Sequence, residues 1–410
     1  MLEYAVTNGV IADGIPGTAL GIKAGLIEFI GPDSELPSAQ TVIDAQGGLI
    51  SPPFVDPHFH FENAFMMGSR TNQSGTLNEA IEIFNEDKLK ITVPEIMARA
   101  EQTIDLAMAN GILWNRSHAD VDQFCGTNIV ECELEVKKAF KDVFDIQVVA
   151  FPQFGTADNP EALDYMWKAM ELGADVVGGK GSLEKDMDAT ARQIEHAFAM
   201  AKKYDRPIDM HIDETADPYW HASEILADLT IENGWQGRVC ASHVTAMGFW
   251  EPAVRSRVID KMLKAEMTVI SNPLTLGGRS YPPGSGLTSI KELLEAGVNV
   301  ALGQDDIRNM FYPYGQMDPM ELANIVVHVA QFDLPHEIEQ VFKFSRHNAA
   351  RALGLKDYGL AVGKPANLMV MDVSSALEAI SVHPAVHYVF HNGKLAMENH
   401  RKTIPYWKYR

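Results

Sequence analysis

Two histidines that could bind a metal ion follow an apolar stretch of the chain. His58 and His60 close the segment Pro53–His60, PFVDPHFH. In a β-strand, residues two apart point to the same face, so both imidazoles would lie on one side of the strand end. Two histidines alone are a weak motif, and a half-buried strand that happens to carry them is an equal alternative. The other polar residues of the chain must decide between the two.

Three more histidines and an aspartate pair also follow apolar stretches. They are His118, the segment His211–Glu214 (HIDE), His243, and the pair Asp305–Asp306. Five of the 14 histidines therefore stand at the ends of predicted strands, which random placement does not readily produce. If the strands form a parallel barrel, these ends meet at the face where active sites lie, so we expect the side chains to converge.

The residue types indicate a metal-dependent hydrolase. Three neutral imidazoles and a carboxylate suit one divalent ion such as Zn²⁺ or Fe²⁺, with a coordination position open for water. Coordination lowers the pKa of such a water to about 7. The predicted ligands are His58, His60, His211 and Asp305.

Two neighbouring residues are expected to assist the reaction. Glu214, three residues after a predicted ligand, can carry a proton to a ring nitrogen or a leaving group. His243, on the next strand, can orient hydroxide or the developing oxyanion. For His118, which has Asp120 and Asp122 nearby, a structural histidine is favoured over a ligand.

The elements that must position these residues alternate along the middle of the chain. Helical spacing of apolar residues predicts helices over residues 94–109 and 187–204, and apolar runs between such helices indicate strands buried on both faces of a parallel sheet. Eight strands favour a closed (β/α)₈ TIM-type barrel. An open doubly wound sheet is the alternative, but no glycine fingerprint for a dinucleotide follows any strand. The predicted strands include 54–55, 112–114, 146–151, 174–177, 207–210, 238–241, 267–270 and 298–302.

Both ends of the chain have a sequence pattern that differs from that of the middle. Short apolar runs separated by turn signals such as Asn8-Gly9 and Asn392-Gly393 indicate strands without helical spacing. We therefore predict a small β-sandwich domain built from residues 1–50 and 359–410, with the barrel at 51–358.

Composition excludes several kinds of partner. The 410 residues hold 34 Lys and Arg against 55 Asp and Glu, a net charge of −21, which repels nucleic acid and anionic membranes. Three cysteines without C-x-x-C spacing indicate neither a disulfide framework nor a thiolate zinc site. No apolar stretch has the length of a membrane span, and no signal peptide is evident. We expect a cytoplasmic homo-oligomer that acts on a small heterocyclic molecule.

The chain resembles the amidohydrolase superfamily and, within it, the bacterial cytosine deaminase group. The resemblance extends over nearly the whole chain. It is carried by residues 52–60, 72–77, 149–153, 173–178, 211–214, 241–247, and the pair 305–306 followed by 311–313.

This resemblance implies a mononuclear metal site and hydrolytic deamination of cytosine or a close analogue. It implies that Asp305 is both a ligand and a proton acceptor from water, and that Glu214 and His243 serve as proton-transfer and oxyanion groups. It also implies that Gln153 binds the carbonyl and ring N–H of a pyrimidine. The remaining implied pocket residues are Leu77, Asp306 and Phe311.

The chain departs from that group in segments that shape the pocket. Phe311 stands where cytosine deaminases carry tryptophan, and Gln304 replaces the usual histidine before the aspartate pair. The Gly/Pro-rich loop 275–284 is shorter than expected, and residues 62–67 differ from the usual sequence. The reaction type is thus better supported than the substrate.

Three alternatives stay open. Lys180, near the end of the fourth predicted barrel strand, could be the carboxylated lysine of a dinuclear enzyme that opens cyclic amides, or it could be a pocket cation or a solvated loop residue. The protein could remove an alkylamine from an aminotriazine, as N-isopropylammelide hydrolases do, although those enzymes diverge at the positions of Gln153 and Glu214. A scaffold that has lost activity is the third, but all the expected ligand positions are filled.

Overall fold

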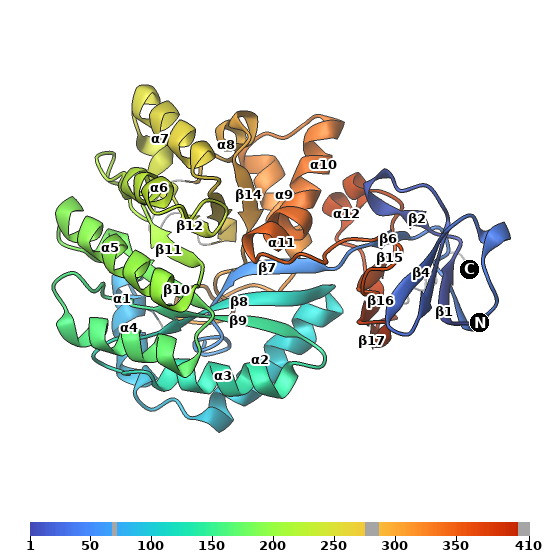
Figure 1. Ribbon diagram of the computed structural model, residues 1–410, viewed down its shortest axis with the longest axis horizontal. Helices are drawn as coiled ribbons and strands as arrows, with labels where there is room; N and C mark the ends of the chain where they lie inside the picture. The colour runs from blue at the N-terminus through green and yellow to red at the C-terminus, as the bar shows by residue number, and fades with distance from the viewer. Residues whose placement is uncertain (68–71, 275–286, 401–410) are drawn as a thin grey trace. The chain divides into compact units, whose positions relative to one another are not determined.

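The computed structural model describes residues 1–67, 72–274 and 287–400 (Figure 1). The predicted loop 275–284 lies outside these residues. The chain divides into two compact units, each described by itself below. One comprises Met1–Phe54, Ala107–Leu113 and Lys356–Arg410, and the other comprises Val55–Leu106 and Trp114–Leu355.

The larger unit is a parallel barrel, which confirms the predicted fold class. Its eight strands are neighbours in the order in which they follow one another in the chain. A parallel bridge between Phe59 and Asp305 joins the first strand to the residues after the last one. The strands are β7 (Phe54–Phe59), β8 (Ile112–Asp120), β9 (Asp145–Phe151), β10 (Val176–Lys180), β11 (Ile208–Ile212), β12 (Val239–His243), β13 (Thr268–Ser271) and β14 (Asn299–Leu302).

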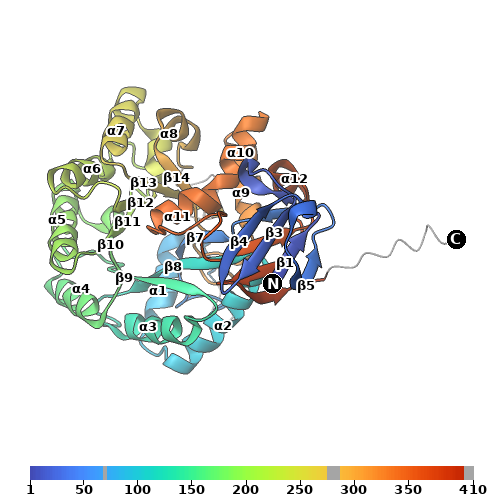
Figure 2. The same ribbon diagram turned by 45° about the vertical axis from the view of Figure 1, so that its right-hand side comes forward.

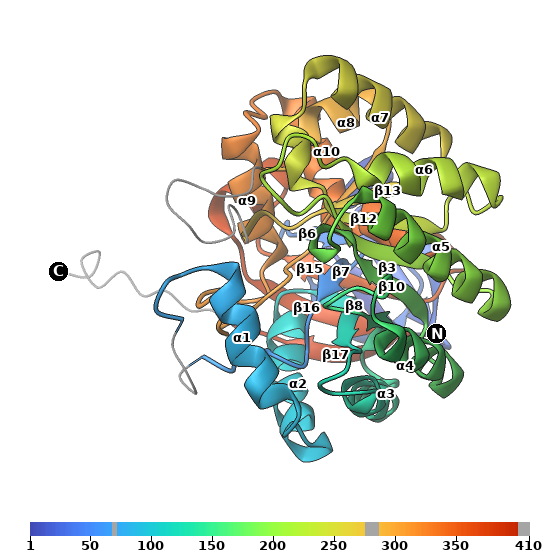
Figure 3. The same cartoon turned by 90° about the vertical axis from the view of Figure 1, so that its left-hand side faces the viewer.

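Helices α3 to α8 form an arc outside the strands (Figure 2), and the two helices between β7 and β8, α1 and α2, are visible in blue and cyan in Figure 3. The helices of this unit are α1 (Leu77–Lys88), α2 (Val93–Ala109), α3 (Asn128–Phe140), α4 (Pro160–Leu172), α5 (Met187–Tyr204), α6 (Ala222–Glu232), α7 (Pro252–Lys264), α8 (Ile290–Ala296), α9 (Pro319–Val329), α10 (Pro335–Lys343) and α11 (Ala349–Ala352).

Local sequence explains where these helices begin and end. The side chain of Asp186 accepts a hydrogen bond from the backbone N–H of Ala189, which caps α5, and Asp205 ends this helix in the left-handed conformation. In α4, Asn159 is the N-cap, and Gly173, with φ of +109°, ends the helix. These signals place the following strands, β10 and β11, at fixed points along the chain.

The smaller unit consists of two sheets that share one apolar core. Val6 and Leu20 of the first sheet belong to the same buried cluster as Ile50, Val370 and Phe390 of the second. The first sheet contains β1 (Leu2–Thr7), β3 (Ala19–Lys23), β4 (Leu26–Gly31) and β5 (Ala39–Asp44). The second contains β2 (Val10–Ile11), β6 (Leu49–Ser51), β15 (Leu368–Met371), β16 (Val386–His391) and β17 (Lys394–Glu398), and helix α12 (Ala376–Val382) lies between β15 and β16.

None of the helices within the described ranges combines the length and the apolar character that crossing a lipid bilayer requires.

Candidate active site

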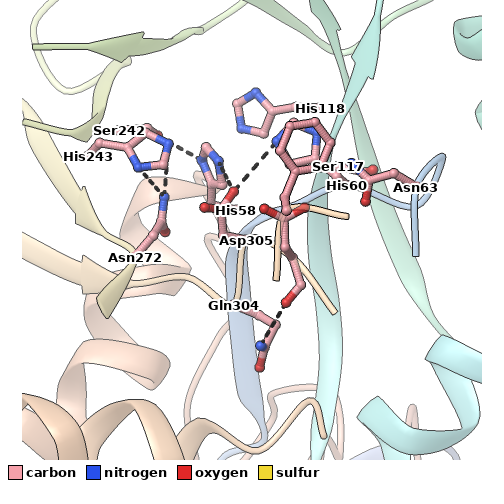
Figure 4. Close-up of polar contacts among 12 residues, drawn as sticks. His58, His60, Asn63, Ser117, His118, Ser242, His243, Asn272, Gln304 and Asp305 are labelled. Carbon is pink, nitrogen blue, oxygen red and sulfur yellow. Dashed lines mark hydrogen bonds and ion pairs between the residues drawn. The ribbon is translucent and has the colours of Figure 1, made fainter. Parts of the chain in front are cut away.

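Four predicted metal ligands come together at the C-terminal ends of the barrel strands. His58 lies in β7, His60 follows that strand, His211 lies in β11, and Asp305 follows β14. All four are buried, and one ligand atom from each lies within 4.8 Å of the others. Figure 4 shows His58, His60 and Asp305 facing one another. Residues 247 positions apart in the sequence thus form one cluster of nitrogen and oxygen donors.

Hydrogen bonds hold the first strand against the segment after the last one. The backbone N–H of Asp305 donates to the carbonyl oxygen of His58 at 2.8 Å. The buried carboxylate of Asp56 accepts from the backbone N–H groups of Gln304 at 3.1 Å and of His58 at 3.3 Å. Asp305 has a φ of +66°, an uncommon conformation for a residue with a side chain. This turn directs its carboxylate toward the histidines.

A chain of polar groups orients the imidazole of His58. Arg116 Nη1 donates to Asp209 Oδ2 at 2.8 Å, and Ser242 Oγ donates to Asp209 Oδ1 at 2.7 Å. With its proton directed to Asp209, Ser242 Oγ accepts from His58 Nδ1 at 2.9 Å. The lone pair of His58 is then on Nε2, which lies 3.2 Å from Asp305 Oδ1.

His60 is oriented by a carboxylate instead. Its Nδ1 lies 2.9 Å from Glu62 Oε1, and its Nε2 lies 3.6 Å from Asp305 Oδ1. Burial alone would lower the pKa of His60, but Glu62, Asp305 and Asp306 together raise the pKa to about 10. These carboxylates therefore favour positive charge at this position.

The donor set fits a divalent metal ion. His211 packs its ring against Phe151 with 4.1 Å between centroids, and its buried Nδ1 has no hydrogen-bond partner among the described residues. A buried polar atom without a partner is costly unless a ligand satisfies it. Three imidazoles and a carboxylate match the ligands that Zn²⁺ and similar ions use in catalytic sites.

Glu214 and His243 lie at the ends of neighbouring strands and face the same site. Glu214 Oε1 is 4.0 Å from His243 Nδ1, and Glu214 Oε2 forms an ion pair with Lys180. Burial alone would raise the pKa of Glu214, but His243 and Lys180 lower it below its ordinary value, which favours the carboxylate. Burial lowers the pKa of His243 to about 4, although Glu214 and Asp305 act in the opposite direction. The low pKa keeps the imidazole of His243 neutral.

Backbone capping fixes the segment that carries Glu214. The carboxylate of Asp213 accepts hydrogen bonds from the backbone N–H groups of Ala222 at 2.7 Å and Ser223 at 3.0 Å, where α6 begins. Asp213 has a φ of +54° and His243 has a φ of +73°. Both strands therefore turn sharply at the residues that present the polar groups.

His118 is buried beside the predicted ligands. Its ring centroid is 4.1 Å from that of His58, and neither of its nitrogens has a hydrogen-bond partner among the residues described. His118, His58 and Asp209 form a second cluster with metal-binding side chains. Because Arg116 already donates to Asp209, a second cation there would be repelled.

A pocket opens in front of the site, and the four predicted substrate-binding residues line it: Gln153, Leu77, Asp306 and Phe311. Lys180 lines it too. Besides Leu77, helix α1 adds three residues to the wall that were not predicted from the sequence, Ile81, Phe84 and Asn85. Their spacing of three and four residues is the signal that could have placed them on one face of a helix.

At the C-terminal end of α1, a buried lysine pairs with two acidic residues. Lys88 Nζ donates to Asp120 Oδ2 at 2.8 Å and forms a second, shorter contact with Asp122. These two aspartates are therefore partners of Lys88. The sequence itself shows them only as neighbours of His118.

Comparison with known proteins identifies the family. Residues 151–397 match the amidohydrolase family. An N-isopropylammelide isopropyl amidohydrolase from Pseudomonas sp. (strain ADP) is 31% identical over 87% of this chain and 88% of that protein. The chain belongs to the amidohydrolase family. This amidohydrolase is also 27% identical, over 95% of its length and 90% of the relative, to a pterin deaminase from Rhizobium rhizogenes.

A solved structure agrees with the family. The crystal structure of 5-methylcytosine deaminase from Klebsiella pneumoniae liganded with 5-fluorocytosine has a TM-score of 0.93 and 31% identity, covering 98% of this chain and 100% of that one. The resemblance to the amidohydrolase superfamily is thus confirmed. The protein is a hydrolase that acts on carbon–nitrogen bonds, and members of its superfamily bind divalent metal ions.

Proposed function

We propose that this amidohydrolase hydrolytically deaminates an amino-substituted N-heterocycle, cytosine or a close analogue. Water adds to the ring carbon that bears the amino group, ammonia leaves, and an oxo group takes its place. The observation that carries this proposal is that Glu214 lies 4.0 Å from His243 and lines the same pocket as His60, His211 and Asp305. A carboxylate in that position can move a proton between water and a ring nitrogen.

His58, His60, His211 and Asp305 would hold one divalent ion, Zn²⁺ or Fe²⁺. Such an ion lowers the pKa of a bound water to about 7 and so supplies a nucleophile at neutral pH.

The roles of the protein groups follow from their chemistry. Asp305 accepts a proton from water, and Glu214 delivers a proton to the ring nitrogen next to the reacting carbon. Neutral His243, whose ring nitrogens lie 3.3 Å from the amide nitrogen of Asn272, orients the oxygen that attacks. Gln153 and Asp306, in the pocket wall, bind the ring, and Leu77 and Phe311 pack against it. These groups place the ring carbon close to the attacking water, which lowers the barrier.

The direct test is product analysis. Purified protein loaded with Zn²⁺ or Fe²⁺ is incubated with aminopyrimidines, aminotriazines and creatinine, and ammonia is measured. Ammonia from at least one ring, lost in Glu214→Gln, is the expected result. Release of no ammonia from any of them would contradict the proposed reaction.

A second candidate reaction is removal of an alkylamine from an aminotriazine. The 31% identical N-isopropylammelide hydrolase favours it. Measuring isopropylamine and ammonia released from N-isopropylammelide separates the two, because only the second reaction yields the alkylamine. The dinuclear alternative requires Lys180 to be a metal ligand, whereas this lysine is paired with Glu214. About two equivalents of metal per chain, rather than one, would support that alternative.

A further inference from the structure

Asn309 is a buried residue in the segment after β14, and its side-chain amide uses all of its hydrogen-bonding capacity. Only 1% of its surface is exposed. Its Oδ1 accepts from the backbone N–H groups of Phe311 at 2.8 Å and Tyr312 at 2.7 Å. Its Nδ2 donates to Asp306 Oδ1 at 2.7 Å and to Asn63 Oδ1 at 2.5 Å. An amide has two donors and two acceptor lone pairs, so every position is occupied.

The partners of this amide determine its orientation. Backbone N–H groups can only donate, so those of Phe311 and Tyr312 must face the amide oxygen. The NH₂ group of Asn309 must then point toward Asp306 and Asn63. An amide turned by half a rotation would place its donors against the backbone donors and its oxygen against the carboxylate. The hydrogen-bond network therefore allows one orientation of the side chain.

Three of the residues that Asn309 contacts line the pocket, whereas Asn309 is not among the described residues that do. They are Asn63, Asp306 and Phe311. Asn63 follows β7 and stands 246 positions before Asn309 in the sequence, while Asp306 and Phe311 lie within three positions of it. One side chain thus contacts pocket residues from the segments after the first and the last barrel strands.

Backbone hydrogen bonds join the same two segments. The backbone N–H of Phe65 donates to the carbonyl oxygen of Ile307 at 3.1 Å, and that of Met67 donates to the carbonyl oxygen of Arg308 at 2.7 Å. The guanidinium of Arg308 also lies 5.5 Å from the ring centroid of Phe65. The backbone thus keeps the two segments adjacent, and the amide of Asn309 adds the contacts that orient their side chains.

The turn at Asn309 also directs Phe311 toward helix α1. The bond from the backbone N–H of Phe311 to Asn309 Oδ1 spans two residues and closes an Asx turn. The ring of Phe311 meets Phe84 of α1 edge to face, with 6.2 Å between centroids. The same amide therefore places both an apolar group of the pocket wall and the carboxylate of Asp306.

We propose that Asn309 is a positioning residue for substrate binding, which acts through Asp306 and Asn63 and does not touch the substrate. Fixing these two side chains before the substrate arrives reduces the entropic cost of ordering them on binding. Neither Glu214 nor His243 is a partner of Asn309 among the described residues, so loss of its donors should weaken binding more than it slows the chemical step. This inference rests on the proposed function for the reaction that is measured.

Asn309→Asp separates the donors of the amide from its acceptor. A carboxylate can still accept from the backbone N–H groups of Phe311 and Tyr312, so the turn is kept. It cannot donate to Asp306 or Asn63, and its charge repels Asp306. kcat and KM are measured for the aminopyrimidine, aminotriazine or creatinine that releases ammonia fastest. We expect KM to rise at least about ten-fold, as for a lost hydrogen bond to a charged group, and kcat to fall by a smaller factor.

Asn299→Asp is the matched control. Asn299 is 9% exposed, and its Nδ2 donates to Thr268 Oγ1 at 2.9 Å and to the carbonyl oxygen of Asn348 at 3.0 Å. It is the first residue of β14, whereas the pocket lies at the C-terminal ends of the strands. The same substitution there also buries a carboxylate and costs stability, which urea unfolding measures in both variants. We expect KM of Asn299→Asp to equal that of wild type.

A crystal structure of Asn309→Asp gives a measurement that does not require turnover. We expect the carboxylate of Asp306 to turn away from residue 309, because the donor that held it has become a like charge. We expect the backbone bonds of Phe65 and Met67 to the segment after β14 to remain.

The outcomes separate the two proposals. If KM of Asn309→Asp equals that of wild type, if Asn299→Asp raises KM by the same factor, or if Asp306 keeps its position in the crystal, the inference is wrong. A fall in kcat larger than the rise in KM would also overturn it, since Asn309 would then act on the chemical step. If no ring yields ammonia while Asp306 turns away in Asn309→Asp, the proposed reaction fails and the positioning of Asp306 by Asn309 stands.

Discussion

The two histidines at the end of β7, His58 within the strand and His60 just after it, are oriented by chemically different partners. His58 faces the hydroxyl of Ser242, and His60 faces the carboxylate of Glu62. A partner of this kind fixes which ring nitrogen is left to bind a metal, and its loss typically lowers metal affinity. The two ligands therefore depend on separate networks.

Removing the Ser242 hydroxyl tests the first network. Ser242→Ala removes the hydrogen bonds that Ser242 Oγ makes with His58 Nδ1 and Asp209 Oδ1. We expect the affinity for Zn²⁺ to fall by about 10- to 100-fold, measured by competition with a chromogenic chelator. Ser271→Ala is the matched control, because Ser271 ends the neighbouring strand β13 and its Oγ has no hydrogen-bond partner in the described ranges. Equal affinities in the two variants would contradict the role of Ser242.

The role of Glu214 as a proton carrier predicts a variant that binds metal but does not turn over. Glu214→Gln keeps the size of the side chain and removes its ability to accept a proton. We expect metal content to stay unchanged and kcat to fall by about 10²- to 10⁴-fold. Metal analysis and the ammonia assay measure the two quantities, with the exposed Glu232→Gln as control. Turnover close to wild type would exclude Glu214 from proton transfer.

At the scale of elements, α1 forms one wall of the pocket and carries a buried cation at its last residue. Lys88, its last residue, is fully buried with Asp120 and Asp122. Its Nζ also lies 5.3 to 5.7 Å from the ring centroids of Phe84, Phe124 and Phe154, within the range of cation–π attraction. We therefore expect the position of α1 to depend on this residue.

Lys88→Met removes the cation and leaves two buried carboxylates without it. We expect the free energy of unfolding to fall by about 3–5 kcal/mol, and KM to rise because Leu77 and Phe84 are no longer held at the pocket. Urea unfolding and steady-state kinetics measure these changes. Lys90→Met is the control, since that side chain is 73% exposed and 3.9 Å from its nearest carboxylate, Asp87. A stable variant with unchanged KM would show that α1 is held by its apolar contacts.

Helices α6 and α7 are joined by an ion pair that predicts a pH dependence of stability. Glu224 accepts from Arg257 Nε at 2.8 Å and Nη2 at 2.9 Å, and lies 3.0 Å from Lys261 Nζ. The bonds from Arg257, followed by those from Lys261, lower the pKa of Glu224 to about 2. Because the pKa is lower in the folded state, the stabilisation is present above about pH 4.5 and is lost as the pH falls toward 2.

Glu224→Gln should therefore reduce the free energy of unfolding by about 1 kcal/mol at pH 7, a small effect because the pair is partly exposed to solvent. The difference between wild type and variant should shrink when urea unfolding is repeated between pH 4.5 and pH 3. A difference that stays constant over this range would show that the carboxylate charge is not responsible.

The barrel can be predicted from the sequence because its strands appear as apolar runs and their C-terminal ends as the polar residues that follow. Each apolar run is followed by a polar residue at the point where the strand ends, so His211, His243 and Asp305 could be placed without knowing their contacts. The pairing of Lys88 with Asp122, 34 residues away, has no such signal. The same holds for the pairing of Lys180 with Glu214. It depends on the register between β10 and β11, which places Lys180 opposite His211. Local patterns therefore identify the strand ends, while pairings between elements require the folded chain.

At the scale of the whole molecule, the proposed metal ligands connect parts of the barrel that are far apart in sequence. They come from β7, from β11 and from the segment after β14. An ion that binds only the folded arrangement must stabilise it by mass action. The proposed ligand set would therefore couple metal binding to the stability of the unit Val55–Leu106 and Trp114–Leu355.

Removal of the metal should lower the melting temperature. At a free metal concentration of 100 times the dissociation constant, the expected stabilisation is about 2.7 kcal/mol. Scanning calorimetry before and after dialysis against a chelator measures the change, and His58→Ala should show little response to added metal. A melting temperature that does not depend on metal in wild type would contradict the proposed ligand set.

The second sheet of the smaller unit has a consequence for protein synthesis. β6 pairs with β15, which follows roughly 320 residues later, whereas the sheet of β1, β3, β4 and β5 is complete within the first 44 residues. At about 5–20 residues per second, a ribosome adds β15 some 15–60 seconds after β6. During that interval β6 presents an unpaired edge, and strands of this kind are prone to pair with other chains. The nascent chain must therefore protect a short apolar strand while the entire barrel is translated.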